Sequence, residues 1–248
     1  MAFLYFAFIA NILLQEELGR YVSLMAAVEI FSPLILFSLE KNLPNLEKKS
    51  FNAYFLILLF FSFLSSSIIG LSISIFFHIN FLIIFLYCVI NGLLRLIEYT
   101  NIRNGRMQLV GLVKVTQFVT IFLILFSLIY IFKISDLSFS SLFSIFVFAY
   151  LINLVWYALF SLKGINFKEA NLKIGFVQIK ENLKFITFVT PSDFFNKAAL
   201  NSPLIFIGIF FGQSFAAQYA LINKLIMSPL GLIVTAVGQI FHSDFAQL

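Results

Sequence analysis

The chain has 248 residues, of which 61% are hydrophobic and 11% charged, and its formal net charge is +5. A soluble domain has about 45–50% apolar and about 25% charged residues, so this composition excludes an ordinary soluble domain and predicts an integral membrane protein. Transmembrane β-strands alternate in hydrophobicity over about ten residues, whereas the apolar runs here approach about twenty, so the predicted membrane segments are helices.

Apolar segments follow one another along the whole chain. They predict an all-α integral membrane protein with about eight transmembrane helices. The segments are 1–14, 21–38, 52–77, 79–97, 112–132, 139–162, 184–211 and 214–240. The first is shorter than the roughly 20 residues that a span needs, and the third is long enough to tilt or to extend beyond the hydrocarbon core. The connections are short, so no extramembrane domain is expected.

The distribution of lysine and arginine predicts the orientation of the chain. If both termini are cytoplasmic, twelve basic residues lie in or beside cytoplasmic connections, against two, Arg20 and Lys133, on the opposite side. The twelve are Lys41, Lys48, Lys49, Arg95, Arg103, Arg106, Lys114, Lys163, Lys168, Lys173, Lys180 and Lys184. Basic residues concentrate on the cytoplasmic side of membrane proteins, so both termini are expected there. The same rule accounts for the net charge, and no nucleic-acid partner is expected.

The stretch Leu93–Leu109 is basic and half apolar. It fits two structures, an amphipathic helix along the cytoplasmic membrane surface or the solvated end of the preceding helix.

The stretch Thr190–Gln247 carries the charges that are least expected in a membrane helix. A short turn at Gly212–Ser214 joins its two apolar segments, which contain Asp193 and Lys197 before the turn and Lys224 after it. An ionisable side chain near the bilayer centre costs about 2.5–3.5 kcal/mol on insertion scales, so it usually faces a bundle interior or an aqueous cavity. These two segments are therefore where a functional site is expected.

Asp193, Asn196 and Lys197 fall on one helical face, where Asp193 and Lys197 are close enough to pair. Lys224 lies within a stripe of small residues, which permits close packing beside a polar cavity. The stripe is Ala217, Ala220, Lys224, Ser228, Gly231 and Thr235. Glu29, halfway along the second segment, is a candidate partner. Two interpretations stay open: the four charges form ion pairs that fix helix register, or the lysines form a cationic cavity for an anionic headgroup.

This stretch resembles the polysaccharide flippases, the O-antigen and repeat-unit exporters of the multidrug/oligosaccharidyl-lipid/polysaccharide exporter superfamily. The residues that carry the resemblance are Phe210–Gly212 after a proline-containing helix, Ala216–Leu221, Lys224, Pro229 and Gly238–Phe241. A Gly-Xaa-Tyr element common in the family's first external connection is matched by Gly19-Arg20-Tyr21.

The resemblance implies two six-helix lobes related by pseudo-symmetry. It divides the chain into a first transmembrane lobe, 1–163, a cytoplasmic linker, 164–183, and the start of a second lobe, 184–248. Four further helices would complete the second lobe, so the chain is expected to be a truncated member of the family.

The family's substrates are undecaprenyl-diphosphate-linked oligosaccharides, such as O-antigen or capsular repeat units, which cross the bacterial inner membrane by alternating access. By resemblance, Lys197 and Lys224 are expected to contact the diphosphate, because lysine binds phosphate as a point charge. Asn196 would share this cavity, and Asp193 and Glu29 would tune it or carry a coupling proton or sodium ion. The expected partners are therefore the lipid-linked oligosaccharide, membrane lipid and a coupling ion.

No catalytic motif of the HExxH, Gly-Lys phosphate-loop, GxSxG or CxxC type occurs in the sequence, so no enzyme activity is expected. The single Cys88 lies in an apolar run and excludes a disulfide framework and a thiolate metal site, so no metal and no cofactor are expected. Three alternatives stay open: a multidrug exporter of the same superfold, a non-functional fragment, and a membrane glycan polymerase or ligase. The last is disfavoured because its large external catalytic loop has no counterpart here.

Overall fold

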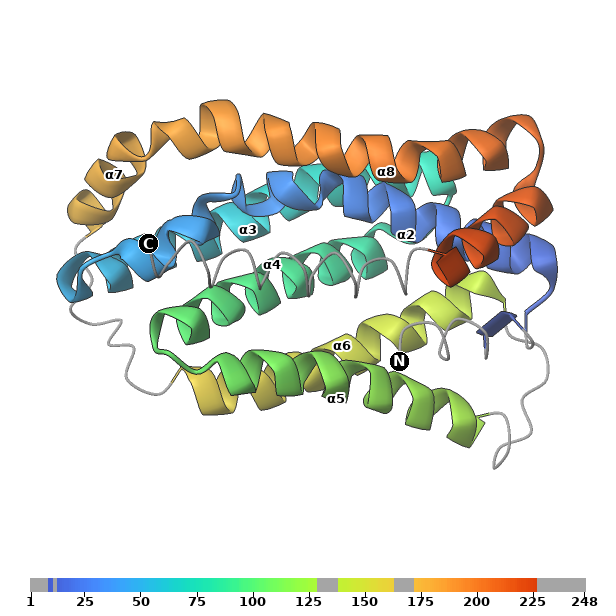
Figure 1. Cartoon of the computed structure of the whole chain (residues 1–248), viewed down its shortest axis with the longest axis horizontal. Coiled ribbons are helices and arrows are strands. Elements are labelled where there is room, and N and C mark those ends of the chain that lie inside the picture. Colours follow the sequence, from blue (N-terminus) through green and yellow to red (C-terminus); the bar gives the residue numbers. More distant parts are fainter. Residues whose placement is uncertain (1–8, 11–12, 129–137, 163–171, 227–248) are drawn as a thin grey trace, which may run out of the picture.

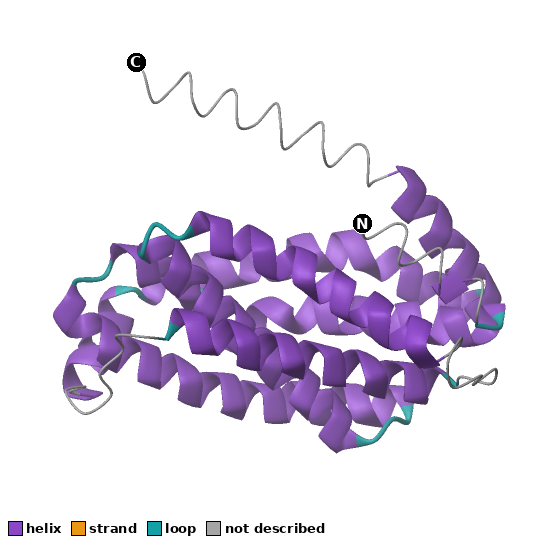
Figure 2. Cartoon of the chain, turned by 90° about the horizontal axis from the view of Figure 1, so that it is seen from below, coloured by secondary structure: helices purple, strands orange, loops and turns teal. Residues whose placement is uncertain are grey.

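A computed structural model describes residues 9–10, 13–128, 138–162 and 172–226, and all regular elements in these ranges are helices (Figure 2). The expected all-α architecture is confirmed. The long helices lie roughly along the long axis of the molecule (Figure 1). They are α2 (Gln15–Leu36), α3 (Lys48–Phe77), α4 (Phe81–Arg103), α5 (Met107–Phe126), α6 (Phe139–Ser161) and α8 (Thr190–Phe210). Residues 213–226 form a further helical segment after α8.

Five described helices are long and apolar enough to cross a membrane. They are Gln15–Leu36, Ser50–Phe77, Phe81–Arg103, Met107–Phe126 and Phe139–Ser161. α8 has similar length, but Asp193, Asn196, Lys197 and Asn201 make it more polar, and it is not among the five. The predicted spans 1–14 and 214–240 fall partly outside the described residues. A multi-pass membrane protein is supported, with five spans identified.

The helices pack as an antiparallel bundle in which α2 lies between α3 and α8, and α4 lies between α3 and α6. Many large apolar side chains remain exposed on the outer surface, among them Phe60, Ile75 and Leu123. Apolar outer faces of this extent suit lipid contact and would be unfavourable in water. The bundle therefore has an apolar core as well as an apolar outer surface, which suits a membrane environment.

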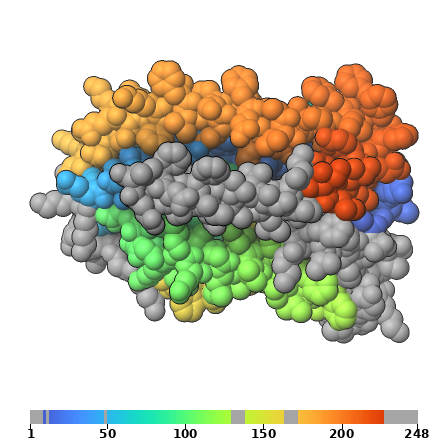
Figure 3. All heavy atoms as spheres, in the orientation of Figure 1, coloured from blue at the N-terminus to red at the C-terminus, as the bar shows by residue number. Residues whose placement is uncertain are grey.

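Part of the predicted linker 164–183 is helical. The short helix α7 (Leu172–Glu181) packs on α3, where Gly175 approaches the backbone of Ala53 so closely that a Cβ would lie 3.0 Å from it. α7 and α8 together form one long edge of the molecule (Figure 3). A π-helical turn, η4 (Phe185–Val189), joins α7 to α8.

Leu93–Leu109 does not form a separate surface helix. α4 continues to Arg103 and α5 starts at Met107, so the stretch is the end of the preceding helix, but that end is largely buried and not solvated as expected. The physical reason is that this end of α4 packs on protein. Arg103 donates to the Leu46 carbonyl at 3.0 Å and stacks over the Phe51 ring, and Asn101 is fully buried.

A sharp corner ends α2 and directs the chain into the short 3₁₀ helix η1 (Leu39–Asn45). Phe37 and Ser38 both have left-handed backbone conformations, with φ of 53° and 51°. Each costs on the order of 1–3 kcal/mol for a residue other than glycine, so neighbouring contacts must hold the corner in place. Thr190 of α8 does so by donating its hydroxyl to the Phe37 carbonyl at 2.5 Å. The corner places η1 against the start of α8.

Candidate functional site

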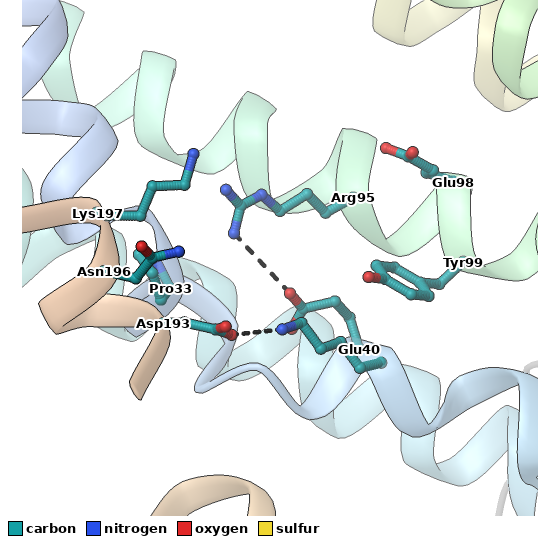
Figure 4. Close-up of a pocket in the computed structure, with 9 residues that line it drawn as sticks. Pro33, Glu40, Arg95, Glu98, Tyr99, Asp193, Asn196 and Lys197 are labelled. Atoms are coloured by element: carbon teal, nitrogen blue, oxygen red, sulfur yellow. Dashed lines mark hydrogen bonds and ion pairs between the residues drawn. The ribbon is translucent and has the colours of Figure 1, made fainter. Parts of the chain in front are cut away.

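The corner between α2 and η1 opens onto a cavity of about 250 Å³, shown in Figure 4. Its lining residues are Pro33, Glu40, Lys41, Arg95, Glu98, Tyr99, Asp193, Asn196 and Lys197. We call it the charged cavity, because three of these residues are basic and three are acidic. They come from α2, η1, α4 and α8, segments that are far apart in the sequence.

On the α8 side of the charged cavity, each charged residue pairs with a residue of another element. Asp193 accepts hydrogen bonds from the ammonium of Lys41 at 2.5 Å and from the hydroxyl of Ser38 at 2.7 Å. Lys197 forms an ion pair with Glu29 of α2. The predicted pair between Asp193 and Lys197 within α8 is therefore not formed. α8 packs along α2 and its start lies against η1, so Asp193 and Lys197 find their partners on those two elements and not on each other.

Glu40 is the most deeply buried charged residue of this cavity, with 3% of its side chain exposed. Its Oε1 lies 3.9 Å from Nη1 of Arg95, and its Oε2 has no hydrogen-bond partner among the described residues. Burial raises the pKa of the Glu40 carboxyl, while Arg95, the glutamate's own backbone and Lys41 oppose this shift without cancelling it.

The guanidinium of Arg95 donates to the carbonyl oxygen of Ser32 at 3.1 Å and to its hydroxyl at 2.8 Å. It projects into the charged cavity toward Glu40 (Figure 4). Glu98, one turn further along α4, pairs with Lys114 of α5 at 2.8 Å. The arginine is thus held by α2 on one side and faces a carboxylate on the other.

A second cavity, of about 420 Å³, lies between α2, α5, α6, α8 and the helical residues 213–226. Its lining residues are Tyr21, Val22, Met25, Ala26, Glu29, Phe118, Phe146, Tyr150, Leu200, Asn201, Leu204, Ala220, Asn223 and Lys224. We call it the central cavity. Its wall is largely apolar and aromatic, with Glu29 and Lys224 as its charged groups and two asparagines beside them.

Lys224 takes part in none of the ion pairs that the described residues form. The candidate partner Glu29 lines the same cavity but is paired with Lys197. Ala217 and Ala220 of the predicted stripe are buried, which agrees with close packing of this helix. Ser228, Gly231 and Thr235 lie outside the described residues. Lys224 therefore remains a cation without a fixed acidic partner in the part of the chain that the structure describes.

The five predicted site residues are divided between the two cavities. Asp193, Asn196 and Lys197 line the charged cavity, and Glu29 and Lys224 line the central one. The Lys197–Glu29 ion pair joins the walls of both. The two cavities are therefore neighbours, one lined mainly by charged residues and the other mainly by apolar and aromatic ones.

Sequence reasoning missed Glu40, Lys41 and Arg95 as members of the site. In the sequence, Lys41 and Arg95 count among the basic residues in or beside the cytoplasmic connections, where they indicate only the orientation of the chain. Arg95 falls inside the predicted span 79–97, and that position was the available signal that it is an intramembrane charge. Glu40 follows the predicted end of its segment by two residues, and only the corner at Phe37 and Ser38 turns it inward.

The turn after α8 is locked against the start of α2. Gly212 adopts φ of +102°, a conformation that favours glycine, and Gln213 accepts a hydrogen bond from Ser23 at 3.1 Å. A Cβ on Gly19 would lie 1.8 Å from the Gln213 carbonyl oxygen, so this contact requires glycine. The turn fixes where the helical residues 213–226, and with them Lys224, enter the bundle.

Comparison with known proteins found no matching family model, no matching curated protein and no matching solved structure. Among the described residues, no group of three or more His, Cys, Asp or Glu side chains is arranged to hold a metal ion.

Proposed function

We propose that this chain is a flippase component that moves undecaprenyl-diphosphate-linked oligosaccharides across the bacterial inner membrane. The observation that carries the proposal is the position of Lys224, a cation without an acidic partner among the described residues, in the wall of a 420 Å³ cavity between membrane helices. Lys224 is exposed on this wall, and a cation that faces lipid or an apolar wall needs a counter-charge, which a diphosphate supplies. The largely apolar wall suits the prenyl end of such a ligand.

The ion-pair interpretation accounts for three of the predicted residues but leaves one unexplained. Asp193, Lys197 and Glu29 all have partners that fix the register of α8 against α2 and η1. Lys224 has none of these contacts. We therefore assign the role of fixing helix register to Asp193, Lys197 and Glu29, and the role of binding the ligand to Lys224.

The proposed orientation rests on the basic residues. η1, the end of α4 and α7 lie at one end of the bundle, and the turn after α8 lies at the other (Figure 1). In the proposed orientation the first end faces the cytoplasm, because basic residues concentrate there. The charged cavity then lies toward the leaflet in which lipid-linked oligosaccharides are assembled.

A multidrug exporter is the second candidate. Tyr21, Phe118, Phe146 and Tyr150 line the central cavity together with Glu29, and aromatic rings beside a carboxylate suit an organic cation. The two candidates differ in the charge of the ligand that they require.

Ligand binding by the purified chain in lipid nanodiscs separates the two candidates. One titration uses an undecaprenyl-diphosphate-linked oligosaccharide, a second uses undecaprenol as a control that lacks the diphosphate, and a third uses tetraphenylphosphonium as an organic cation. The flippase proposal predicts saturable binding of the first ligand alone. Saturable binding of tetraphenylphosphonium without binding of the diphosphate would favour the exporter.

A further inference from the structure

Glu40 occupies an unusual position for an ionised carboxylate. It is almost completely buried, it lines the charged cavity, and one of its oxygens has no hydrogen-bond donor among the described residues. A buried ionised carboxylate without its full set of hydrogen bonds is costly, whereas the protonated form is tolerated far better. The guanidinium of Arg95, at 3.9 Å, is too distant for a short hydrogen-bonded pair.

The elements η1, α3, α4 and α8 contribute the charged or titratable groups around Glu40, and α2 lines the cavity with Pro33. These groups are Lys41 on η1, Tyr54 on α3, Arg95, Glu98 and Tyr99 on α4, and Asp193 and Lys197 on α8. Three of these groups form ion pairs with other partners. Lys41 pairs with Asp193, Lys197 with Glu29, and Glu98 with Lys114. Arg95 and Glu40 are the remaining pair, so the charges of the cluster balance only while Glu40 is ionised.

Protonation of Glu40 changes this balance in one step. The carboxyl gains a proton and loses its charge, and Arg95 becomes a cation without a counter-charge in the same cavity. Its guanidinium retains the two hydrogen bonds to Ser32, which hold it in place. A planar fork with five donors suits the oxygens of a phosphate group, which it can bind through two parallel hydrogen bonds.

We infer that Glu40 and Arg95 form a proton-linked anion site, in which proton uptake by Glu40 releases Arg95 to bind a phosphate-bearing ligand. The two binding events are then mutually reinforcing, because the proton and the anion each favour the state that the other requires. This inference rests on the proposed function for the identity of the natural ligand, a diphosphate headgroup. It adds to that function a coupling ion, the proton, and a headgroup ligand, Arg95.

The test measures proton uptake by the purified chain in nanodiscs when inorganic diphosphate is added in weak buffer. At a pH above the pKa of Glu40 in the free protein, the wild type should take up about one proton more per bound diphosphate than Glu40→Gln, which is nearly isosteric and cannot titrate. Protonation of diphosphate itself is common to both proteins and cancels in the comparison. Above the pKa of Glu40, wild-type affinity relative to the variant should fall by on the order of tenfold per pH unit.

Three further variants keep the test specific. Glu181→Gln removes a carboxylate of α7 that lies outside both cavities and should leave the extra proton uptake unchanged. Arg95→Ala should bind diphosphate more weakly than the wild type, and Arg95→Lys, which retains the positive charge, should recover part of the affinity. Equal proton uptake by wild type and Glu40→Gln would overturn the inference, as would unchanged diphosphate affinity in Arg95→Ala.

Failure of the inference and failure of the proposed function give different results. Proton-linked binding of inorganic diphosphate without binding of the lipid-linked oligosaccharide would retain the site and remove the flippase proposal. Binding of the lipid-linked oligosaccharide without Glu40-dependent proton uptake would retain the proposal and remove the proton-linked site.

Discussion

The ammonium of Lys197 on α8 forms an ion pair with the carboxylate of Glu29 on α2, and this pair joins the walls of the charged and central cavities. Both residues lie on helices that pack closely along their length. The pair therefore sets the register of α8 against α2 at the point where the two cavities adjoin.

Breaking this pair should destabilise the bundle non-additively. Lys197→Ala leaves Glu29 unpaired, and Glu29→Gln leaves Lys197 unpaired, whereas the double variant leaves neither. Side chains in direct contact show coupling energies of about 0.5–3 kcal/mol, so the double variant should cost less than the sum of the singles. Unfolding of the three variants in mixed micelles measures this coupling, and strictly additive effects would show that the pair has no role in register.

The contact between Gly19 and Gln213 makes a second prediction about stability. Gly19→Ala places a methyl group where the Gln213 carbonyl oxygen lies 1.8 Å away, so the turn and the helical residues 213–226 must shift. Overpacking typically costs about 1–3 kcal/mol, and a clash with backbone lies at the upper end. Thermal unfolding in detergent should show a lower midpoint for this variant.

Gly111 on α5 provides the matched control, because a Cβ there meets no atom within 4 Å. Gly111→Ala should be neutral or stabilising by up to about 1 kcal/mol, since alanine is the better helix former. Equal destabilisation by both substitutions would indicate a general effect of losing glycine and would contradict the close contact at Gly19.

The orientation is testable with single cysteines. Cys88 is fully buried, so it should contribute little background labelling by a membrane-impermeant maleimide. Cysteines at positions 48, 103 and 173 should be labelled only after the cells are opened, and a cysteine at position 213 should be labelled in intact cells. Labelling at position 173 in intact cells would reverse the proposed topology.

The apolar pattern predicted the middle of the fold well, because a membrane helix needs a long apolar run. The predicted segments 52–77, 112–132 and 139–162 correspond to α3, α5 and α6. The ends were less well predicted: α4 continues to Arg103 and α2 starts at Gln15, since a helix extends past its apolar run wherever polar side chains find partners. α7 was missed because a ten-residue amphipathic helix gives no span-length signal.

The candidate site was predicted in part. The charges on α8 and Lys224 were identified because they interrupt apolar runs, but their partners depend on how helices pack and cannot be read from spacing within one helix. Asp193 pairs with Lys41 across 152 positions of sequence, whereas the i,i+4 spacing suggested Lys197. Glu40 was missed because its burial depends on two left-handed residues, Phe37 and Ser38, that are not glycine and give no turn signal.

The central claim is that Lys224 binds the diphosphate of a lipid-linked oligosaccharide, and the affinity of Lys224 variants in nanodiscs tests it most directly. Lys224→Ala should yield folded protein at a normal level, because no described ion pair is broken, while the affinity falls by about ten- to a hundredfold. Lys224→Arg should retain part of the affinity. Lys180→Ala, on α7 and outside both cavities, should bind as the wild type does. Unchanged affinity in folded Lys224→Ala would contradict the claim.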